Sequence, residues 1–176
     1  LRSARDVLDA MQEDILAKGL EEGFDRDGLP TGLADLDRLL GGLKPGGLYV
    51  IGAATHVGKS QLKLQIAYNL ASAGHPCAYL SLEMSEKQVV NNLMEIRMNT
   101  RFSMLDTLNR RLAAENKIID AFGFVSDLPI LVTEHPGLTI PVLRSLAMQA
   151  SLRPGGIRVL FLDYSQLMGD AFRYRG

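Results

Sequence analysis

The sequence contains a single cysteine and lacks any long hydrophobic run. Cys77 has no second cysteine to pair with, which excludes an internal disulfide and suits a reducing cytoplasm. Because Cys77 begins an apolar segment, we interpret it as a small core residue rather than a reactive thiol. No apolar run approaches the roughly 20 residues of a membrane span, and no signal peptide is evident. We therefore predict a cytoplasmic protein with no membrane partner.

Net charge is also nearly absent. The 19 basic and 20 acidic residues give a formal charge of −1, so any contact with nucleic acid must come from local loops. The chain has no His/Cys/Asp cluster with metal-site spacing and no Gly-x-Ser-x-Gly elbow, which argues against a zinc site and a serine hydrolase. Internal repeats are not found either.

Short apolar segments alternate with amphipathic ones, as expected for a single α/β domain of 176 residues. Because the expected strands are apolar throughout, we predict a mostly parallel sheet with helices on both faces. The expected strands are 48–51, 77–82, 130–133 and 157–162, and the expected helices are 33–40, 61–73, 85–98, 106–122 and 139–152.

The stretch GAATHVGKS at residues 52–60 predicts a phosphate-binding loop between a strand and a helix. It departs from the G-x-x-x-x-G-K-[ST] pattern, because Ala53 occupies the first glycine position and the glycine stands one earlier, at Gly52. Open N–H groups and the helix dipole attract an anion at such a turn. The expected phosphate cradle comprises Ala54, Thr55, His56, Val57, Gly58, Lys59, Ser60 and Gln61.

Within this loop, Lys59 supplies a mobile positive charge for the β- and γ-phosphates of ATP, and the Ser60 hydroxyl is a ligand for Mg²⁺. His56 either contacts phosphate or fills the turn. The helix N-terminus and these two side chains together predict a site for Mg-ATP.

Two acids follow predicted strands and therefore fall at the same edge of a parallel sheet. Asp163 follows residues 157–162 and is expected to bind Mg²⁺ together with Ser60. Glu83 follows residues 77–82 and is expected to be the general base that activates water. The alternatives are an acid in an ordinary turn at Asp163 and an acid favoured by the next helix dipole at Glu83.

Four motifs resemble the C-terminal motor domain of bacterial DnaB-type replicative helicases. They are PTGLADLDRLLGGLKPG at 30–46, SLEMS at 81–85, PGLT at 136–139 and DYSQLM at 163–168. The first is shared with RecA-, RadA- and KaiC-type ATPases, whereas SLEMS and DYSQLM are more specific. The resemblance implies a RecA-like P-loop NTPase fold, Lys59 and Glu83 as catalytic residues, and ATP bound between the subunits of a homo-oligomeric ring, usually a hexamer. It also implies single-stranded DNA, a helicase loader and primase as partners.

The N-terminal segment is expected to be a helix at about 3–20 with one apolar stripe formed by Val7, Leu8, Met11 and Ile15. That stripe covers either its own domain or a neighbouring subunit, and the resemblance favours the neighbour. We expect residues 1–24 to be this linker helix and residues 25–176 to be the ATPase core.

The resemblance further implies that the carboxyl-terminal part of the core, with the arginine finger, is missing from the sequence. Arg173 and Arg175 are either solvated tail charges or contacts to DNA phosphate. The main hypothesis is a helicase motor that couples ATP hydrolysis to translocation on single-stranded DNA and duplex unwinding. The alternatives are an ATPase switch of the RecA, RadA or KaiC kind and a nucleotide-binding fragment without turnover.

Overall fold

The computed structural model describes residues 5, 9, 12–13, 28–54 and 57–163. The chain forms two compact units, Leu1–Val50 and Ile51–Gly176. In the first unit, Arg5, Asp9, Gln12 and Glu13 are helical and exposed, as expected for the polar side of the N-terminal helix. The apolar stripe predicted at residues 7–15 lies outside the described residues.

Among residues 28–50, which the structure describes, the first unit contains one short helix, α2 (Ala34–Leu40). It ends at Gly41, whose φ of 69° is the left-handed conformation that glycine adopts without strain. The Asp37 carboxylate accepts hydrogen bonds from the backbone N–H groups of Thr31 (2.7 Å) and Gly32 (3.1 Å), which ties the preceding loop to the helix. The helix predicted at residues 33–40 is confirmed.

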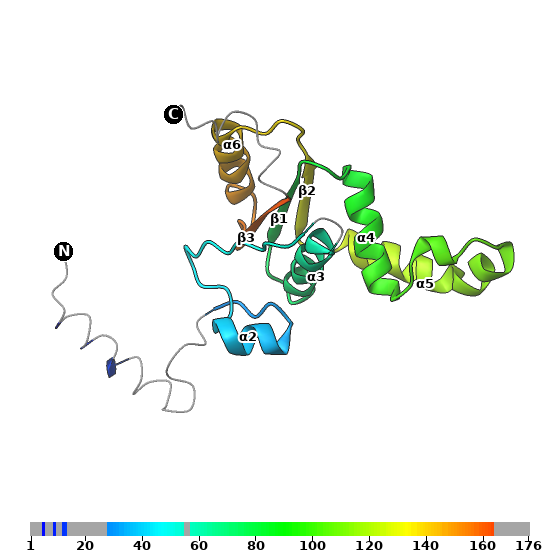
Figure 1. Cartoon of the computed structure of the whole chain (residues 1–176), viewed down its shortest axis with the longest axis horizontal. Coiled ribbons are helices and arrows are strands. Elements are labelled where there is room, and N and C mark those ends of the chain that lie inside the picture. Colours follow the sequence, from blue (N-terminus) through cyan, green and yellow to red (C-terminus); the bar gives the residue numbers. More distant parts are fainter. Residues whose placement is uncertain (1–4, 6–8, 10–11, 14–27, 55–56, 164–176) are drawn as a thin grey trace. The chain divides into compact units, whose positions relative to one another are not determined.

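The second unit is organised around a three-stranded parallel sheet (Figure 1). Its strands are β1 (Cys77–Ser81), β2 (Ile130–Glu134) and β3 (Val159–Asp163), in the order β2-β1-β3. Central strand β1 is buried at every position. Its last residue, Ser81, is in register with Glu134 and with Asp163, so the carboxyl ends of all three strands meet at one edge.

The described part of the second unit also contains four helices and a short 3₁₀ turn. They are α3 (Lys59–Ser72), α4 (Glu86–Met98), η1 (Phe102–Met104), α5 (Leu108–Ser126) and α6 (Ile140–Ser151). The predicted helices are confirmed, with ends displaced by up to four residues. The start of α4 is sharply defined because Ser85 and Gln88 form a reciprocal capping box.

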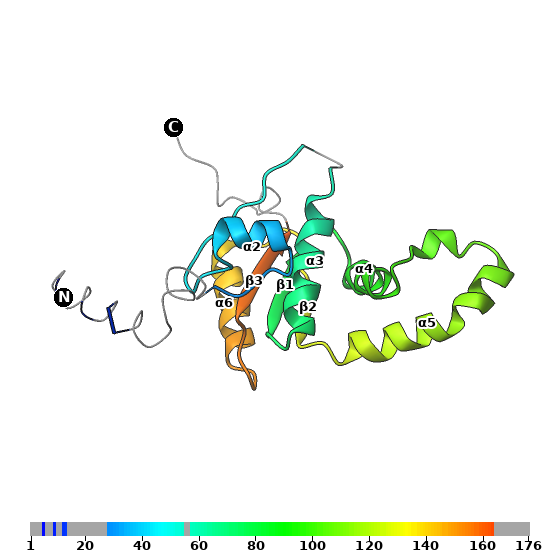
Figure 2. The same ribbon diagram turned by 90° about the horizontal axis from the view of Figure 1, so that it is seen from below.

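Helices cover both faces of the sheet, as predicted. Successive strand residues point to opposite faces. Asp163 contacts Lys63 of α3, whereas its neighbour Leu162 packs in a cluster with Leu143 and Leu146 of α6. Helices α3 and α6 therefore lie on opposite faces, with the sheet between them in Figure 2.

The prediction of a strand at residues 48–51 is wrong. Residues 47–54 form no helix or strand, and the Leu48 and Val50 side chains are 89% and 83% exposed. A strand needs a hydrogen-bonded neighbour, and among the described residues none pairs with this segment. Its apolar sequence indicated burial but carried no information about a partner strand.

The Cys77 thiol is fully buried at the start of β1, as the sequence suggested. Burial raises the pKa of Cys77 to about 12, so the thiol stays protonated and unreactive near neutral pH. None of the described helices is both long and apolar enough to cross a membrane.

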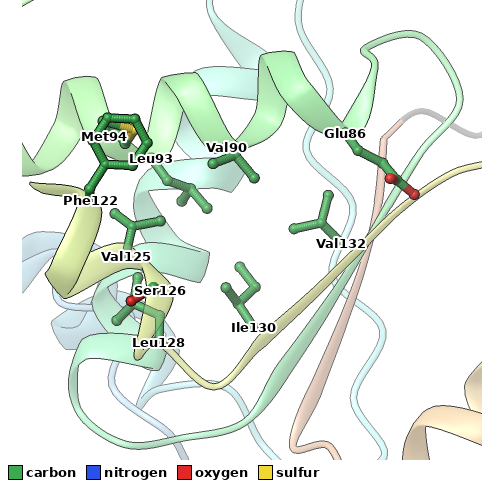
Figure 3. A pocket seen from close by; sticks show the side chains of 10 residues that line it. All are labelled: Glu86, Val90, Leu93, Met94, Phe122, Val125, Ser126, Leu128, Ile130 and Val132. Carbon is green, nitrogen blue, oxygen red and sulfur yellow. The ribbon is translucent and has the colours of Figure 1, made fainter.

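An apolar cavity of about 360 Å³ lies between α4, α5 and β2 (Figure 3). Val90, Leu93 and Met94 of α4 face Phe122 and Val125 of α5 across it. Helix α5 buries few side chains: Leu112, Ile119 and Phe122 are each about 60% exposed. Phe122 belongs both to the lining of this cavity and to the exposed apolar side chains of α5.

We expect Leu70→Ala to destabilise the second unit by about 2–5 kcal/mol, because Leu70 of α3 is fully buried and its truncation leaves a cavity. Urea unfolding followed by circular dichroism measures the loss. The matched control is Leu112→Ala in α5, where an exposed side chain should change stability by less than about 0.5 kcal/mol. Equal effects of the two substitutions would contradict the packing of α3 on the sheet.

Candidate functional site

The phosphate loop ends in an open helix N-terminus. Gly58 is the residue before α3, and its φ of 99° places it in the region that favours glycine. The first helical hydrogen bond runs from Leu62 N–H to Gly58 C=O at 2.9 Å. The N–H groups of Lys59, Ser60 and Gln61 therefore have no acceptor within the helix, and no side chain caps them. This arrangement suits an anion.

Lys59 folds back over the loop. Its Nζ donates hydrogen bonds to the carbonyl oxygens of Ala53 at 2.7 Å and Ala54 at 3.0 Å. The ammonium is thus held at the loop beside the open helix end. Gly58 and Val57 are exposed next to it, while Thr55 and His56 of the predicted cradle lie outside the described residues.

Glu83 projects from a bend that is fixed on both sides. On the strand side, Ser81 Oγ accepts a hydrogen bond from Met84 N–H at 2.8 Å. On the helix side, Ser85 N–H donates to Gln88 Oε1 at 2.9 Å. Glu83 itself is exposed, and among the described residues its carboxylate has no hydrogen-bond or ion-pair partner. The side chain is free to meet solvent at this edge.

Glu83 and Asp163 belong to the same edge of the sheet. Leu82 N–H, next to Glu83, donates to the backbone C=O of Asp163 at 2.7 Å. On the other side of β1, His135 N–H donates to Ser81 C=O at 2.9 Å. The sequence-based expectation that both acids follow adjacent strands at one edge agrees with this geometry.

The Asp163 carboxylate is buried and already partnered, which the sequence did not indicate. Oδ1 forms an ion pair with Lys63 Nζ, and Oδ2 accepts a hydrogen bond from Tyr79 OH at 2.8 Å. Lys63 also donates to Leu162 C=O at 3.3 Å. Asp163 is 1% exposed and the Lys63 side chain 12%. These contacts join α3, β1 and β3.

The position of Tyr79, which donates to Asp163, is fixed by packing. Its ring is fully buried and stacks on Phe161 with 6.1 Å between centroids. Burial raises the pKa of Tyr79, and the Asp163 charge raises it further, so the phenol remains a donor to the carboxylate. Lys63 was not among the residues predicted from the sequence; its position four residues after Lys59, on the same side of one helix, is the sequence signal that points to a second cation.

The predicted magnesium ligands have suitable chemistry. A hydroxyl at Ser60 and a carboxylate at Asp163 are oxygen donors of the kind that Mg²⁺ prefers. Ser60 is half-buried in the first turn of α3. Among the described residues, no group of three or more His, Cys, Asp or Glu side chains forms a metal cluster. A cation here would depend on few protein ligands together with nucleotide phosphate.

The comparisons with known proteins agree with these features. The family model described as "DnaB-like helicase C terminal domain" matches residues 28–175. The replicative DNA helicase DnaC of Bacillus subtilis is 29% identical over 173 residues, covering 98% of this chain and 38% of the relative. Replicative DNA helicase DnaB of Haemophilus influenzae is 31% identical over 163 residues, covering 88% and 34%. The chain thus spans little more than a third of these relatives.

Solved structures show the same fold. One solved ATPase domain superposes with a TM-score of 0.83 at 25% identity, covering 99% of this chain and 61% of that one. A structure of a DnaB-like replicative helicase and its interactions with primase gives 0.82 at 24%, covering 100% and 42%. These likenesses confirm the predicted RecA-like α/β fold. Because the family model matches most of this sequence, the chain belongs to the family of DnaB-like helicase C-terminal domains.

Proposed function

We propose that this chain is the ATP-hydrolysing motor of a replicative DNA helicase, which couples hydrolysis to translocation on single-stranded DNA and to duplex unwinding. The observation that carries the proposal is the meeting of Glu83 and Asp163 at one sheet edge, in a chain whose α3 opens on a phosphate loop. A phosphate cradle, a carboxylate at the metal and a base for water are the parts that ATP hydrolysis requires.

In this proposal the triphosphate of ATP occupies the loop before α3. The N–H groups of Lys59, Ser60 and Gln61 donate to phosphate oxygens, and the helix dipole adds a favourable field. Lys59 exchanges the carbonyls of Ala53 and Ala54 for a phosphate oxygen, which is a stronger, charge-assisted acceptor. Ala54, Thr55, His56, Val57 and Gly58 complete the proposed cradle.

Glu83 is the proposed general base. Its exposed carboxylate accepts a proton from the attacking water, and the hydrogen bonds of Ser81 and Ser85 on either side hold the backbone of Glu83 at the sheet edge. Ser60 and Asp163 would hold Mg²⁺, which when bound supplies positive charge against the β- and γ-phosphates. Lys59 acts on the same phosphates from the loop side.

The proposed setting is a cytoplasmic homo-oligomeric ring, a hexamer by analogy with the family. Single-stranded DNA is the proposed track, with a helicase loader and primase as further partners. The interaction with primase reported for the structurally similar helicase supports the last of these. Because the net charge is −1, we expect local loops, and not a broad basic surface, to contact DNA phosphate.

Ring assembly has a proposed contact of its own. The apolar stripe Val7, Leu8, Met11 and Ile15 of one subunit would pack on the apolar surface of a neighbouring subunit at the α4–α5 cavity. That surface offers Val90, Phe122 and Ile119 to solvent. An amphipathic helix laid into an apolar groove buries both surfaces at once.

Lys59→Ala should weaken ATP binding roughly tenfold to a hundredfold, because it removes one charge-assisted hydrogen bond to phosphate. A fluorescent ATP analogue titrated into the protein measures the affinity. Lys117→Ala, which removes an exposed lysine of α5, is the control and should bind like the unaltered protein. Unchanged affinity in Lys59→Ala would contradict the placement of phosphate at this loop.

Glu83→Gln should lower ATP turnover by about 10²–10⁴-fold while leaving ATP affinity nearly unchanged, because the amide keeps the shape but cannot accept the proton of water. Phosphate release is followed with and without single-stranded DNA. Glu86→Gln, three residues later in the first turn of α4, is the matched control. DNA-stimulated turnover that survives in Glu83→Gln would exclude Glu83 as the base. Tight binding without turnover in the unaltered chain would support the nucleotide-binding fragment instead.

Met11→Asp should weaken subunit association by about 10- to 100-fold, since a buried apolar side chain contributes roughly 1.5–3 kcal/mol. Sedimentation velocity at several concentrations reports the distribution of species. Gln12→Asp places the same charge at a described, exposed helical position and should leave assembly intact. Phe122→Asp, on the opposite side of the proposed contact, should reproduce the effect of Met11→Asp. Assembly that is insensitive to both would rule this contact out.

A further inference from the structure

Asp163 already has a cationic partner within the protein, the side chain of Lys63. Lys63 Nζ pairs with Oδ1, and Tyr79 OH donates to Oδ2, so each carboxylate oxygen already has a donor. The carboxylate is 1% exposed, which leaves it little contact with solvent. A carboxylate that serves as a metal ligand would need at least one oxygen turned toward the metal.

The Lys63 ammonium lies on the side of Asp163 that faces α3. Residues three apart on a helix are surface neighbours, so Ser60 and Lys63 lie along the same face of α3. Contact with Asp163 shows that this face is turned toward β3. The ammonium therefore lies on the side from which Ser60 and Asp163 would share a cation.

We propose that Lys63 is a built-in competitor of the divalent cation at Asp163, so that the cation reaches this carboxylate only after the ammonium has moved aside. The inference rests on the proposed nucleotide site, where Ser60 and Asp163 are assigned to Mg²⁺. It adds that Lys63, a residue outside the phosphate loop, sets how much divalent cation the site requires. Lys63 is in this sense a positioning residue, because it acts through Asp163.

The physical reason is repulsion at short range. Two cations that share one buried carboxylate repel each other strongly, because little water screens them. The ammonium has a second acceptor, Leu162 C=O at 3.3 Å, so it can leave Oδ1 without losing every partner. Tyr79 keeps Oδ2 in place during this exchange. Lys63 therefore lowers the affinity of the Asp163 site for a divalent cation, while the orientation of the Asp163 carboxylate is unchanged.

The test is a titration with Mn²⁺, a paramagnetic substitute for Mg²⁺, in the absence of nucleotide. Free Mn²⁺ is measured by electron paramagnetic resonance for the unaltered protein and for Lys63→Met, which preserves side-chain bulk without the charge. We expect at least about tenfold tighter binding in Lys63→Met. Equal or weaker binding would overturn the inference. Lys117→Met is the matched control at an exposed lysine and should not differ from the unaltered protein.

A second pair of variants keeps the test decisive. The double variant Lys63→Met/Asp163→Asn should lose the gain, which locates it at the carboxylate; a gain that persists would contradict the proposal. If circular dichroism shows that Lys63→Met does not fold, Lys63→Gln takes its place. Its neutral amide can still donate to Asp163, and the same tenfold criterion applies.

Binding of a non-hydrolysable ATP analogue separates this inference from the proposed function. In the presence of EDTA, the affinity of the analogue depends on the phosphate loop alone. When Mg²⁺ is added, the increase in affinity measures the contribution of the cation. Lys63→Met should reach half-maximal enhancement at about one tenth of the Mg²⁺ concentration. An analogue that binds under neither condition would refute the nucleotide site. An analogue that binds with an unchanged Mg²⁺ requirement would refute the role of Lys63 only.

Discussion

The buried pair of Lys63 and Asp163 is the constraint on which the arrangement of the site depends. Taking both charges out of water is costly, and removing one partner would leave the other uncompensated at about 3–5 kcal/mol. Together with the buried Leu64, Ala67 and Leu70 of the same helix, the pair fixes which side of α3 faces the sheet, and the hydrogen bond from Tyr79 holds the carboxylate against β1. Since α3 begins at Lys59, the phosphate loop is placed relative to the sheet edge through the same contacts.

The two acids at that edge have opposite environments, and this difference matches the separate roles proposed for them. Asp163 is buried with a donor on each oxygen, whereas Glu83 is exposed on a bend held by Ser81 and Ser85. A general base must meet water and exchange its proton, which Glu83 can do from its position. A carboxylate that organises cations is better held rigid. Both acids follow strands in the sequence, yet only the packing around them distinguishes one from the other.

Features that depend on neighbouring residues could be predicted from the sequence, and features that depend on distant partners could not. The helix that begins after Ser85, the glycine before α3 and the alternation of strands with helices are all local, and each was predicted correctly. The segment at 48–51 looked like a strand because it is apolar, but a strand also needs a partner at its edge. The contact of Lys63 joins residues 100 positions apart, so no local pattern predicts it.

Helix α5 leaves much of its apolar surface uncovered by its own unit. It is 19 residues long, but only Ala121 and Val125 are buried, while Leu112, Ile119 and Phe122 remain largely exposed. Few side chains of this helix are buried by its own unit, and exposed apolar side chains gathered on one element are typical of an interaction site. The apolar stripe predicted at the N-terminus would also need a surface to cover. In the proposed ring each predicted stripe would cover the next subunit, so that both apolar surfaces would be buried at once and the nucleotide site and the subunit contact would be parts of one assembly.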